Sequence, residues 1–378
     1  MTAPEASRFA FLGFHNGPGG IGRVIINLAN GMAAQGHQVD LLFARPGAHD
    51  APQLDPTVGI HIIGGRKGLS TLPGLLRYLR KHRPAVLMTN KEWANQVAFV
   101  ANRIGGVGVP NVIRVGTVGS AALAQRGALK RRLRAFAMRL SYGGATRFIA
   151  NSSGVRNDLV GNFGVDADRV DVIFNPIIPP EIEELAAAQP DHPWLRQADI
   201  PVLVAVGRLV EPKDYPTLLR AFAHVKARRP CRLVILGEGQ KRAELENLAG
   251  KLDVADDLAM PGFTANPFGW YAQASLFVLS SKREGFPNVI AESLATGAPV
   301  VATDCHSGPR EILADGRYGR LVPVGDDHAL AAAILDTLDA PPDRQHQRSG
   351  ATEFTRQRGT RHYLESFARC LEKPGEND

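Results

Sequence analysis

Short apolar runs alternate with longer amphipathic stretches along most of the chain. Residues 22–36, GRVIINLANGMAAQG, space their apolar side chains as a helix does and end in a glycine. Nine apolar runs are typical of buried strands, at residues 8–14, 37–44, 85–90, 111–117, 146–152, 201–209, 231–239, 276–281 and 298–304. This alternation predicts βαβ units and parallel sheets, which is an α/β fold.

The alternation is interrupted once, by the Pro-rich and acidic passage NPIIPPEIEELAAAQPDHPW. A chain of 378 residues also exceeds what one hydrophobic core usually organises. We therefore predict two similar α/β domains, residues 1–178 and 179–359, joined by a polar linker near residues 176–200. Because ligands of such sheets bind outside the carboxyl ends of the strands, the functional residues are expected there.

Composition and charge indicate the class of protein and the surfaces that it can contact. Hydrophobic residues make up 44% and charged residues 21% of the chain, as in ordinary soluble proteins, and no apolar run is long enough to span a membrane. The first residues lack the pattern of a signal peptide, so we expect a cytoplasmic location. Residues 1–178 hold 21 Lys and Arg against 9 Asp and Glu, while the remainder holds 23 against 28. Only the first domain is thus expected to face an anionic surface.

The first glycine-rich segment, GFHNGPGGIGRV, contains the pattern G-x-G-x-x-G at Gly17, Gly19 and Gly22. In a dinucleotide-binding chain the first glycine follows the first strand at once, and an acidic residue closes the second strand. Here FHN intervenes, and Asp40 stands early in its run. We therefore favour a loop whose backbone N–H groups approach a phosphate at the start of a helix. A purely structural turn and a nicotinamide or flavin site remain open.

Two cations follow a predicted strand in VGRLVEPKDYPTLLRAF. Arg208 comes just after the strand, and Lys213 stands five residues later, before a helix. Arg binds phosphate oxygens as a fork and Lys as a point charge, so the pair suits a diphosphate. Two solvated surface cations would be the alternative. The next strand ends at Gly237 and Gly239, which leaves the backbone open to a flat base or a ribose.

Two glutamates follow a later strand in FVLSSKREGFPNVIAESL. Glu284 stands in a loop, a helix is expected to begin near Pro287 and Asn288, and Glu292 follows inside that helix. The first N–H groups of a helix can bind phosphate oxygens. A carboxylate at Glu292 could accept hydrogen bonds from the vicinal hydroxyls of a ribose. Glu284 is placed for the hydroxyls of whatever group the phosphate carries.

Four segments together resemble the retaining glycosyltransferases of family 4: EGFPNVIAESLATGAPVVATD, VGRLVEPKDYPTLLRAF, GPGGIGRVIINLANGMAAQGHQV and ANSSGVRNDL. The resemblance implies the GT-B fold, two facing Rossmann-like domains with a cleft between them. It assigns the acceptor to residues 1–178 and the nucleotide-sugar donor to residues 179–359, with a last helix at about 360–378 packing back on the first domain. TDCHSGPREIL further resembles enzymes that extend lipid-linked oligosaccharides or surface polysaccharides, such as lipopolysaccharide or capsule, often from UDP-hexosamines.

The resemblance also implies roles for single residues. Glu284, Arg208 and Lys213 would carry the chemistry, Glu284 at the donor sugar and the two cations at the diphosphate. The remaining donor-binding residues would be Gly19, Gly20, Gly237, Glu238, Phe263, Thr264, Gly285, Phe286, Pro287, Asn288 and Glu292, with the base near Phe263 and the ribose at Glu292. The reaction would displace a nucleoside diphosphate with retention at the anomeric carbon, and no metal or other cofactor is required.

One feature departs from that family. Many members carry a histidine after a strand of the first domain, but NVIRVGTVGSAAL contains none. The acceptor-side candidates are His15, Asn90, Arg114 and Thr117, and a solvated loop histidine is the alternative for His15. Asp166-Ala167-Asp168 matches the metal-binding D-x-D of another glycosyltransferase architecture, but its position predicts a turn, where Asp is common.

The segment AQRGALKRRLRAFAMRLSYGG places Leu129, Leu133, Phe136 and Leu140 on one stripe of a helix with basic residues around it. Such a helix can dock on anionic lipid, which predicts peripheral contact with the inner face of the membrane. A core-facing helix with a solvated basic side is the alternative. No nucleic-acid recognition motif accompanies the basic surface. Two other readings of the whole chain stay open: a sugar-nucleotide epimerase or oxidoreductase on a similar scaffold, and a non-catalytic sugar-nucleotide binding protein.

Overall fold

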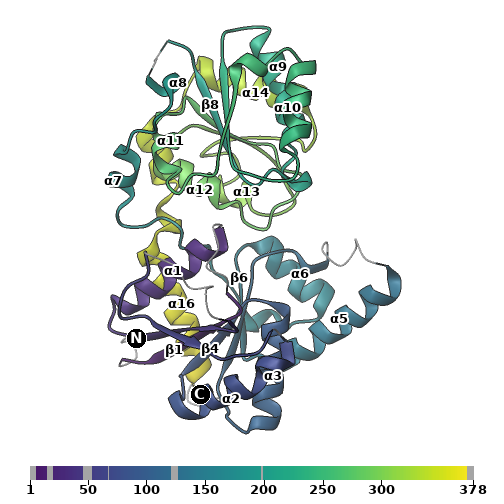
Figure 1. Cartoon of the computed structure of the whole chain (residues 1–378), viewed down its shortest axis with the longest axis vertical. Helices are drawn as coiled ribbons and strands as arrows, with labels where there is room; N and C mark the ends of the chain where they lie inside the picture. The colour runs from purple at the N-terminus through teal and green to yellow at the C-terminus, as the bar shows by residue number, and fades with distance from the viewer. Residues whose placement is uncertain are drawn as a thin grey trace. The chain divides into compact units, whose positions relative to one another are not determined.

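The protein is described by a computed structural model that covers residues 6–14, 20–45, 53–66, 68–120, 127–196 and 199–372, without the side chains of residues 128 and 129. His15 and Gly19 lie outside the described residues. The chain divides into two compact units, Met1–Ile177 with Arg356–Asp378, and Ile178–Thr355 (Figure 1). Within the described residues, no helix is both long and apolar enough to cross a membrane.

The first unit is built on a parallel sheet of seven strands in the order β3-β2-β1-β4-β5-β6-β7. The strands are β1 (Arg8–Leu12), β2 (Gln38–Phe43), β3 (Gly59–Ile62), β4 (Val86–Thr89), β5 (Asn111–Val115), β6 (Arg147–Ala150) and β7 (Val170–Val172). Its α-helices are α1 (Gly20–Ala33), α2 (Leu72–His82), α3 (Glu92–Gly105), α5 (Ala128–Gly143), α6 (Ser153–Phe163) and α16 (Arg356–Leu371). The strand order changes direction between β1 and β4, which makes this unit doubly wound.

The C-terminal helix α16 belongs to the first unit and packs against α1 (Figure 1). A Cβ atom on Gly31 of α1 would lie 2.2 Å from Thr360 Oγ1, so the two helices meet at a glycine. The Phe367 ring packs 5.1 Å from that of Phe9 in β1. Asp171 of β7 accepts a hydrogen bond from Ser366 Oγ at 2.6 Å. The last helix therefore completes the core of the unit in which the chain begins.

The second unit repeats the architecture with six parallel strands in the order β10-β9-β8-β11-β12-β13. The strands are β8 (Val202–Val206), β9 (Arg232–Leu236), β10 (Leu258–Gly262), β11 (Leu276–Leu279), β12 (Val300–Thr303) and β13 (Arg320–Val322). Its α-helices are α7 (Ile182–Ala187), α8 (Pro193–Arg196), α9 (Tyr215–Lys226), α10 (Arg242–Lys251), α11 (Phe268–Gln273), α12 (Asn288–Ala295), α13 (Pro309–Ile312), α14 (Asp327–Asp339) and α15 (Arg344–Ser349). Two Rossmann-like α/β units are thus confirmed.

The nine predicted strands are confirmed, and four strands were missed: β3, β7, β10 and β13. Each of the four is an edge strand of its sheet. The prediction of a polar linker near residues 176–200 needs correction, because much of that passage folds within the second unit. It contains α7 and α8, α7 packs against α11, and Asn266 Nδ2 donates to the Leu185 carbonyl at 2.8 Å. Most of its described polar side chains are exposed, as expected of a polar passage.

Candidate functional site in the second unit

The donor-site residues predicted in the second unit follow four neighbouring strands, and a further loop follows the next strand. Phe263 and Thr264 follow β10, Gly237 and Glu238 follow β9, and Arg208 follows β8. The loop with Glu284 follows β11, and residues 304–308 follow β12. All these strands are parallel and adjacent in the sheet, so their carboxyl ends form one edge. The strand order changes direction between β8 and β11, and such a switch point is where doubly wound sheets bind their ligands.

Lys213 and Glu284 meet at that switch point. Lys213 Nζ donates to Glu284 Oε1 at 2.6 Å, and Ser281 Oγ donates to the same oxygen at 2.7 Å. The Lys213 side chain is 20% exposed and that of Glu284 12%. The second carboxylate oxygen, Oε2, has no protein hydrogen-bond partner among the described residues. The pair therefore presents a half-buried cation and a carboxylate oxygen that is available to a ligand.

Asp214 fixes the conformation of the loop that carries Lys213. Asp214 is buried and adopts a left-handed backbone with φ of 48° directly before α9. One of its carboxylate oxygens accepts from Thr217 Oγ1 at 2.8 Å, and the other pairs with Lys282 Nζ at 3.2 Å. Ser280 Oγ also donates to the Lys213 carbonyl at 2.9 Å. These bonds join the loop after β8 to the loop after β11, so Lys213 and Glu284 are held in register.

Arg208 lies on the same edge but is bonded differently. Its side chain is exposed, and its guanidinium has no ion pair or hydrogen bond with any described residue. Ser281, by contrast, is fully buried, and its carbonyl accepts hydrogen bonds from Thr303 Oγ1 at 2.7 Å and Cys305 Sγ at 2.8 Å. The site thus combines one guanidinium that can turn toward a ligand with a rigid Lys–Glu pair.

The loop of Gly285, Phe286 and Pro287 leads into α12, which begins at Asn288. Ser307 Oγ donates to the Gly285 carbonyl at 2.9 Å, and the Phe286 ring packs 5.6 Å from Phe354. Glu292, one turn inside α12, is only 2% exposed and accepts a hydrogen bond from the Tyr271 hydroxyl at 3.2 Å. The carboxylate predicted for a ribose is therefore buried beneath the edge rather than displayed on it.

A cavity of about 350 Å³ lies at the β9 and β10 end of the same edge. Among the residues that line it are Phe263, Thr264 and Leu236, with Trp270 and the passage from Ala188 to Asp191. Phe263 is 57% exposed, and Glu238 pairs with Arg242 at 2.6 Å. Gly237 approaches β8 so closely that a Cβ atom would lie 2.0 Å from the Gly207 carbonyl oxygen. An aromatic-lined hollow of this size can hold a flat base.

The acceptor-side candidates of the first unit lie around Arg114. Arg114 is 1% exposed and donates to Asn90 Oδ1 at 3.1 Å, to Asn175 Oδ1 at 2.5 Å and to the Tyr363 hydroxyl at 3.0 Å. All three partners are neutral. Arg114, predicted as an acceptor-side residue, is thus a buried arginine that positions Asn90 and links α16 to the sheet through hydrogen bonds. Thr117 is exposed, and Gly20 is the first residue of α1.

Sequence reasoning missed three residues that support the site of the second unit, which are Asp214, Ser281 and Tyr271, and it missed Tyr363, which bonds Arg114 in the first unit. A local signal existed for Asp214, an acidic residue placed directly before a predicted helix. The D-x-D tripeptide was interpreted correctly, because Asp166 Oδ1 accepts from the Asp168 backbone N–H at 3.0 Å and caps a short turn. Cys305, adjacent to His306 in the sequence, is buried, and burial raises the pKa of its thiol to about 11.

A doubly wound α/β unit with cations and a carboxylate at its switch point suits an anionic ligand, and comparisons with known families identify the class of protein. Residues 19–176 match the family described as "Glycosyl transferase 4-like domain", and residues 200–340 match "Glycosyl transferases group 1". The chain belongs to this family of glycosyltransferases, as its sequence resemblance implied.

Three curated relatives illustrate the match. A D-inositol 3-phosphate glycosyltransferase of Thermomonospora curvata is 30% identical over 95% of this chain and 93% of its own. The lipopolysaccharide core biosynthesis glycosyltransferase LpsE of Rhizobium meliloti is 29% identical over 94% and 98%. An N-acetylgalactosamine-N,N'-diacetylbacillosaminyl-diphospho-undecaprenol 4-alpha-N-acetylgalactosaminyltransferase of Campylobacter jejuni is 33% identical, but the match spans only about half of each chain, 54%.

A solved structure shares the fold across the whole chain. Anabaena HepE, crystallised in complex with UDP, superposes with a TM-score of 0.79 over 96% of this chain and all of that one, at 20% identity. A further crystal structure of the same protein is in complex with UDP-glucose. At this identity the likeness establishes the fold alone, which is that of two Rossmann-like domains.

Proposed function

We propose that this protein transfers a hexose or N-acetylhexosamine from a nucleoside diphosphate, UDP above all, to a lipid-linked or glycan acceptor of the cell envelope. The pairing of Lys213 with Glu284 at the switch point of the second sheet carries the proposal. It puts a cation and a carboxylate within 2.6 Å of each other where a doubly wound sheet binds its ligand. The names of the Campylobacter and Rhizobium relatives support the acceptor class, and the HepE complexes support UDP.

In this proposal each residue of the edge has a task. Arg208 and Lys213 bind the diphosphate, the backbone of residues 285–288 binds its oxygens at the start of α12, and Oε2 of Glu284 accepts a hydroxyl of the donor sugar. The base occupies the cavity beside Phe263. Glu292 reaches the ribose after a rearrangement that frees it from Tyr271.

The proposed reaction retains the configuration of the anomeric carbon. The bond from that carbon to the diphosphate oxygen breaks, and the acceptor hydroxyl oxygen bonds to the same face. Its proton passes to the departing diphosphate oxygen. Charge develops on the leaving group, so the main task of the protein is electrostatic stabilisation by Arg208 and Lys213. These two cations take the part that a metal ion plays elsewhere, and we expect transfer to persist in a chelator.

Thermal unfolding in the presence of UDP, GDP, ADP and NAD tests the donor assignment. A ligand at a hundred times its Kd stabilises a protein by about 2.7 kcal/mol, which is a shift of several degrees. We expect a shift with UDP in the wild type and none in an Arg208→Ala/Lys213→Ala double variant. A shift with NAD alone would overturn the proposal.

Product analysis then separates transfer from the other activities a similar scaffold could support. An acceptor-dependent release of UDP, with the anomeric configuration of the product read by NMR, identifies a retaining transferase. Conversion of the sugar nucleotide without an acceptor would instead identify an epimerase. Binding without any turnover would identify a carrier or regulator.

We also propose that α5 docks the first unit on an anionic membrane. The described members of the apolar stripe are exposed, Leu133 by 63%, Phe136 by 68% and Leu140 by 52%. The described residues of α5 that pack on the core are instead Ala135, Met138 and Tyr142, which supports an outward orientation of the stripe. A basic helix with an outward apolar stripe fits a lipid-linked acceptor.

A further inference from the structure

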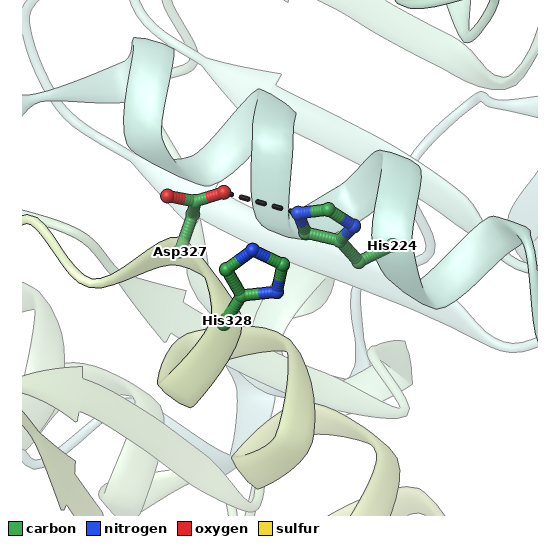
Figure 2. A group of neighbouring side chains, drawn as sticks. All are labelled: His224, Asp327 and His328. Carbon is green, nitrogen blue, oxygen red and sulfur yellow. Dashed lines mark hydrogen bonds and ion pairs between the residues drawn. The ribbon is translucent and has the colours of Figure 1, made fainter.

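Two histidines and an aspartate converge on the outside of the second unit, away from the residues used above (Figure 2). His224 lies near the end of α9, and Asp327 and His328 begin α14. The two helices pack against one another, with Phe222 of α9 and Leu330 of α14 in one hydrophobic cluster. The three side chains are thus presented by two rigid elements whose relative position is set by the core.

The separations suit the ligands of one metal ion. One potential ligand atom from each residue lies within 4.8 Å of the other two. His224 Nε2 is 3.1 Å from Asp327 Oδ2, and the two imidazole rings stack with centroids 4.2 Å apart. Bonds of about 2.0 Å to a tetrahedral Zn²⁺ place any two ligand atoms roughly 3.3 Å apart. In Figure 2 the three side chains lie beside one another, and the dashed line joins His224 to Asp327.

The chemistry of the donors also fits. Asp327 contributes a carboxylate whose side chain is 21% exposed and lies between His224 and Arg220. Arg220 approaches the other oxygen, Oδ1, at 3.7 Å and leaves Oδ2 on the histidine side. His328 is exposed, so an ion can enter from solvent.

We propose that His224, Asp327 and His328 form a binding site for a first-row transition-metal ion, with Zn²⁺ as the expected occupant and water in the fourth position. Zn²⁺ accepts two imidazoles and one carboxylate, whereas Mg²⁺ and Ca²⁺ prefer oxygen ligands to imidazole nitrogens. The site joins α9 to α14 by its ligands. Because α9 begins directly after Lys213 and Asp214, the ion braces the helix from which the proposed donor loop emerges. It takes no part in the transfer itself.

A rival account is that the three residues form only a stacked histidine pair with an ion pair to Asp327. His224 and Asp327 are 103 positions apart in the sequence, so the sequence spacing does not by itself indicate a metal site. The two accounts differ in one measurable property, which is saturable binding of one metal ion per chain.

The test is a titration of tag-free protein with Zn²⁺, in competition with a chromophoric chelator. We expect one site in the wild type, weakened at least about tenfold in His224→Gln/His328→Gln, a variant that keeps size and polarity. The matched control is His61→Gln/His82→Gln, which removes another close histidine pair, with rings 5.0 Å apart in the first unit. Binding that is absent, unchanged by the first variant, or lost only in the second overturns the proposal.

Thermal unfolding keeps the test independent of folding defects. Zn²⁺ should raise the melting temperature of the wild type and of the control, but not that of His224→Gln/His328→Gln, whose own melting temperature in chelator should match the wild type in chelator. Mg²⁺ should shift none of the three. An equal shift with Mg²⁺ would show a non-selective cation surface and contradict the proposal.

Discussion

Lys213 and Glu284 are 71 positions apart in the sequence, and their side chains meet with Nζ 2.6 Å from Oε1. The two residues lie in the loops after β8 and β11, which are neighbours at the point where the sheet reverses its strand order. Ser281 and Asp214 fix this relationship from the two sides. Because the pair is bonded before any ligand arrives, a diphosphate must compete with Glu284 for the Lys213 ammonium.

This competition predicts what loss of the cation does. Lys213→Ala should lower kcat/KM for sugar transfer by about 10²–10³-fold, the usual effect of removing one group that stabilises a departing anion. It should also weaken UDP binding measured by calorimetry. The control is Lys241→Ala, since Lys241 is a partly exposed cation of the same unit that pairs with Glu244. An equal loss in both variants would show that the Lys213 effect is not specific.

Loss of the Glu284 carboxylate should lower the rate of sugar transfer without weakening UDP binding. Glu284→Gln keeps the size of the side chain and an oxygen for Ser281, but it removes the charge that holds Lys213. UDP affinity should stay the same or increase, because UDP carries no sugar and meets less competition for the ammonium. Transfer from the sugar nucleotide should fall by about 10²-fold. Calorimetry with UDP beside steady-state kinetics checks the split, and a parallel loss of both would refute it.

The buried arginine of the first unit predicts a stability effect. Arg114→Met leaves Asn90 Oδ1, Asn175 Oδ1 and the Tyr363 hydroxyl without this donor, and an unsatisfied buried polar group costs about 1–3 kcal/mol. We expect an overall loss of about 3–5 kcal/mol. Hydrogen exchange should accelerate in β5 and α16 but not in the second unit.

Arg103→Met is the matched control for Arg114→Met. Arg103 is an exposed arginine of the same unit, on α3, and its replacement should change stability by less than about 0.5 kcal/mol. If Arg114→Met exchanged at the rate of this control while transfer failed, Arg114 would act on the acceptor rather than on the fold.

The central strands could be predicted from the sequence, and the edge strands could not. β8 and β11 are covered on both faces, so they are continuous apolar runs such as VLVAV and LFVL. At the edges, β3 reads GIHI with alternate residues exposed, and β13 is the three residues RLV. Half-exposed strands of three or four residues lack the apolar run that distinguishes a strand from a loop.

In the candidate site, too, some features could be predicted from the sequence and others could not. Arg208, Lys213 and Glu284 lie in local motifs next to predicted strands, so the spacing of these motifs was sufficient to select them as candidates. The contacts that hold them depend on distances in space: Ser281 belongs to the site because its hydroxyl meets Glu284, and Tyr271 because its hydroxyl meets Glu292. The bond from Arg114 to Tyr363 spans 249 positions and could be found only once α16 was placed in the first unit.

The anchorage of α16 should depend on pH. Burial raises the pKa of the Asp171 carboxyl, but Arg147, Ser366 and Arg369 together lower it below its usual value. A carboxyl whose pKa is depressed by folding stabilises the fold above its unfolded pKa of about 3.9, and the stabilisation is lost as the pH falls further. Amide exchange in α16, corrected for the intrinsic rate, should therefore accelerate below about pH 4.

Asp171→Asn separates this carboxyl from general acid effects. The variant cannot ionise, so α16 should exchange faster than the wild type at pH 6 and respond less to acid. Glu365→Gln is the control, because Glu365 lies on α16 itself and its side chain is 47% exposed. An acid response of α16 that is the same in all three proteins would assign the effect to other carboxyl groups.

The exposed stripe of α5 predicts how the protein meets a membrane. Liposomes that contain anionic lipid should carry the protein upward in a flotation gradient at low salt and release it at high salt, because each cation near the surface contributes about 1 kcal/mol. Leu133→Ser/Phe136→Ser should abolish flotation without unfolding, since both side chains are exposed. Ile104→Ser is the matched control, a 78% exposed apolar residue of α3 in the same unit. Flotation that ignores lipid charge, or that the two α5 substitutions leave intact, would rule out docking through this helix.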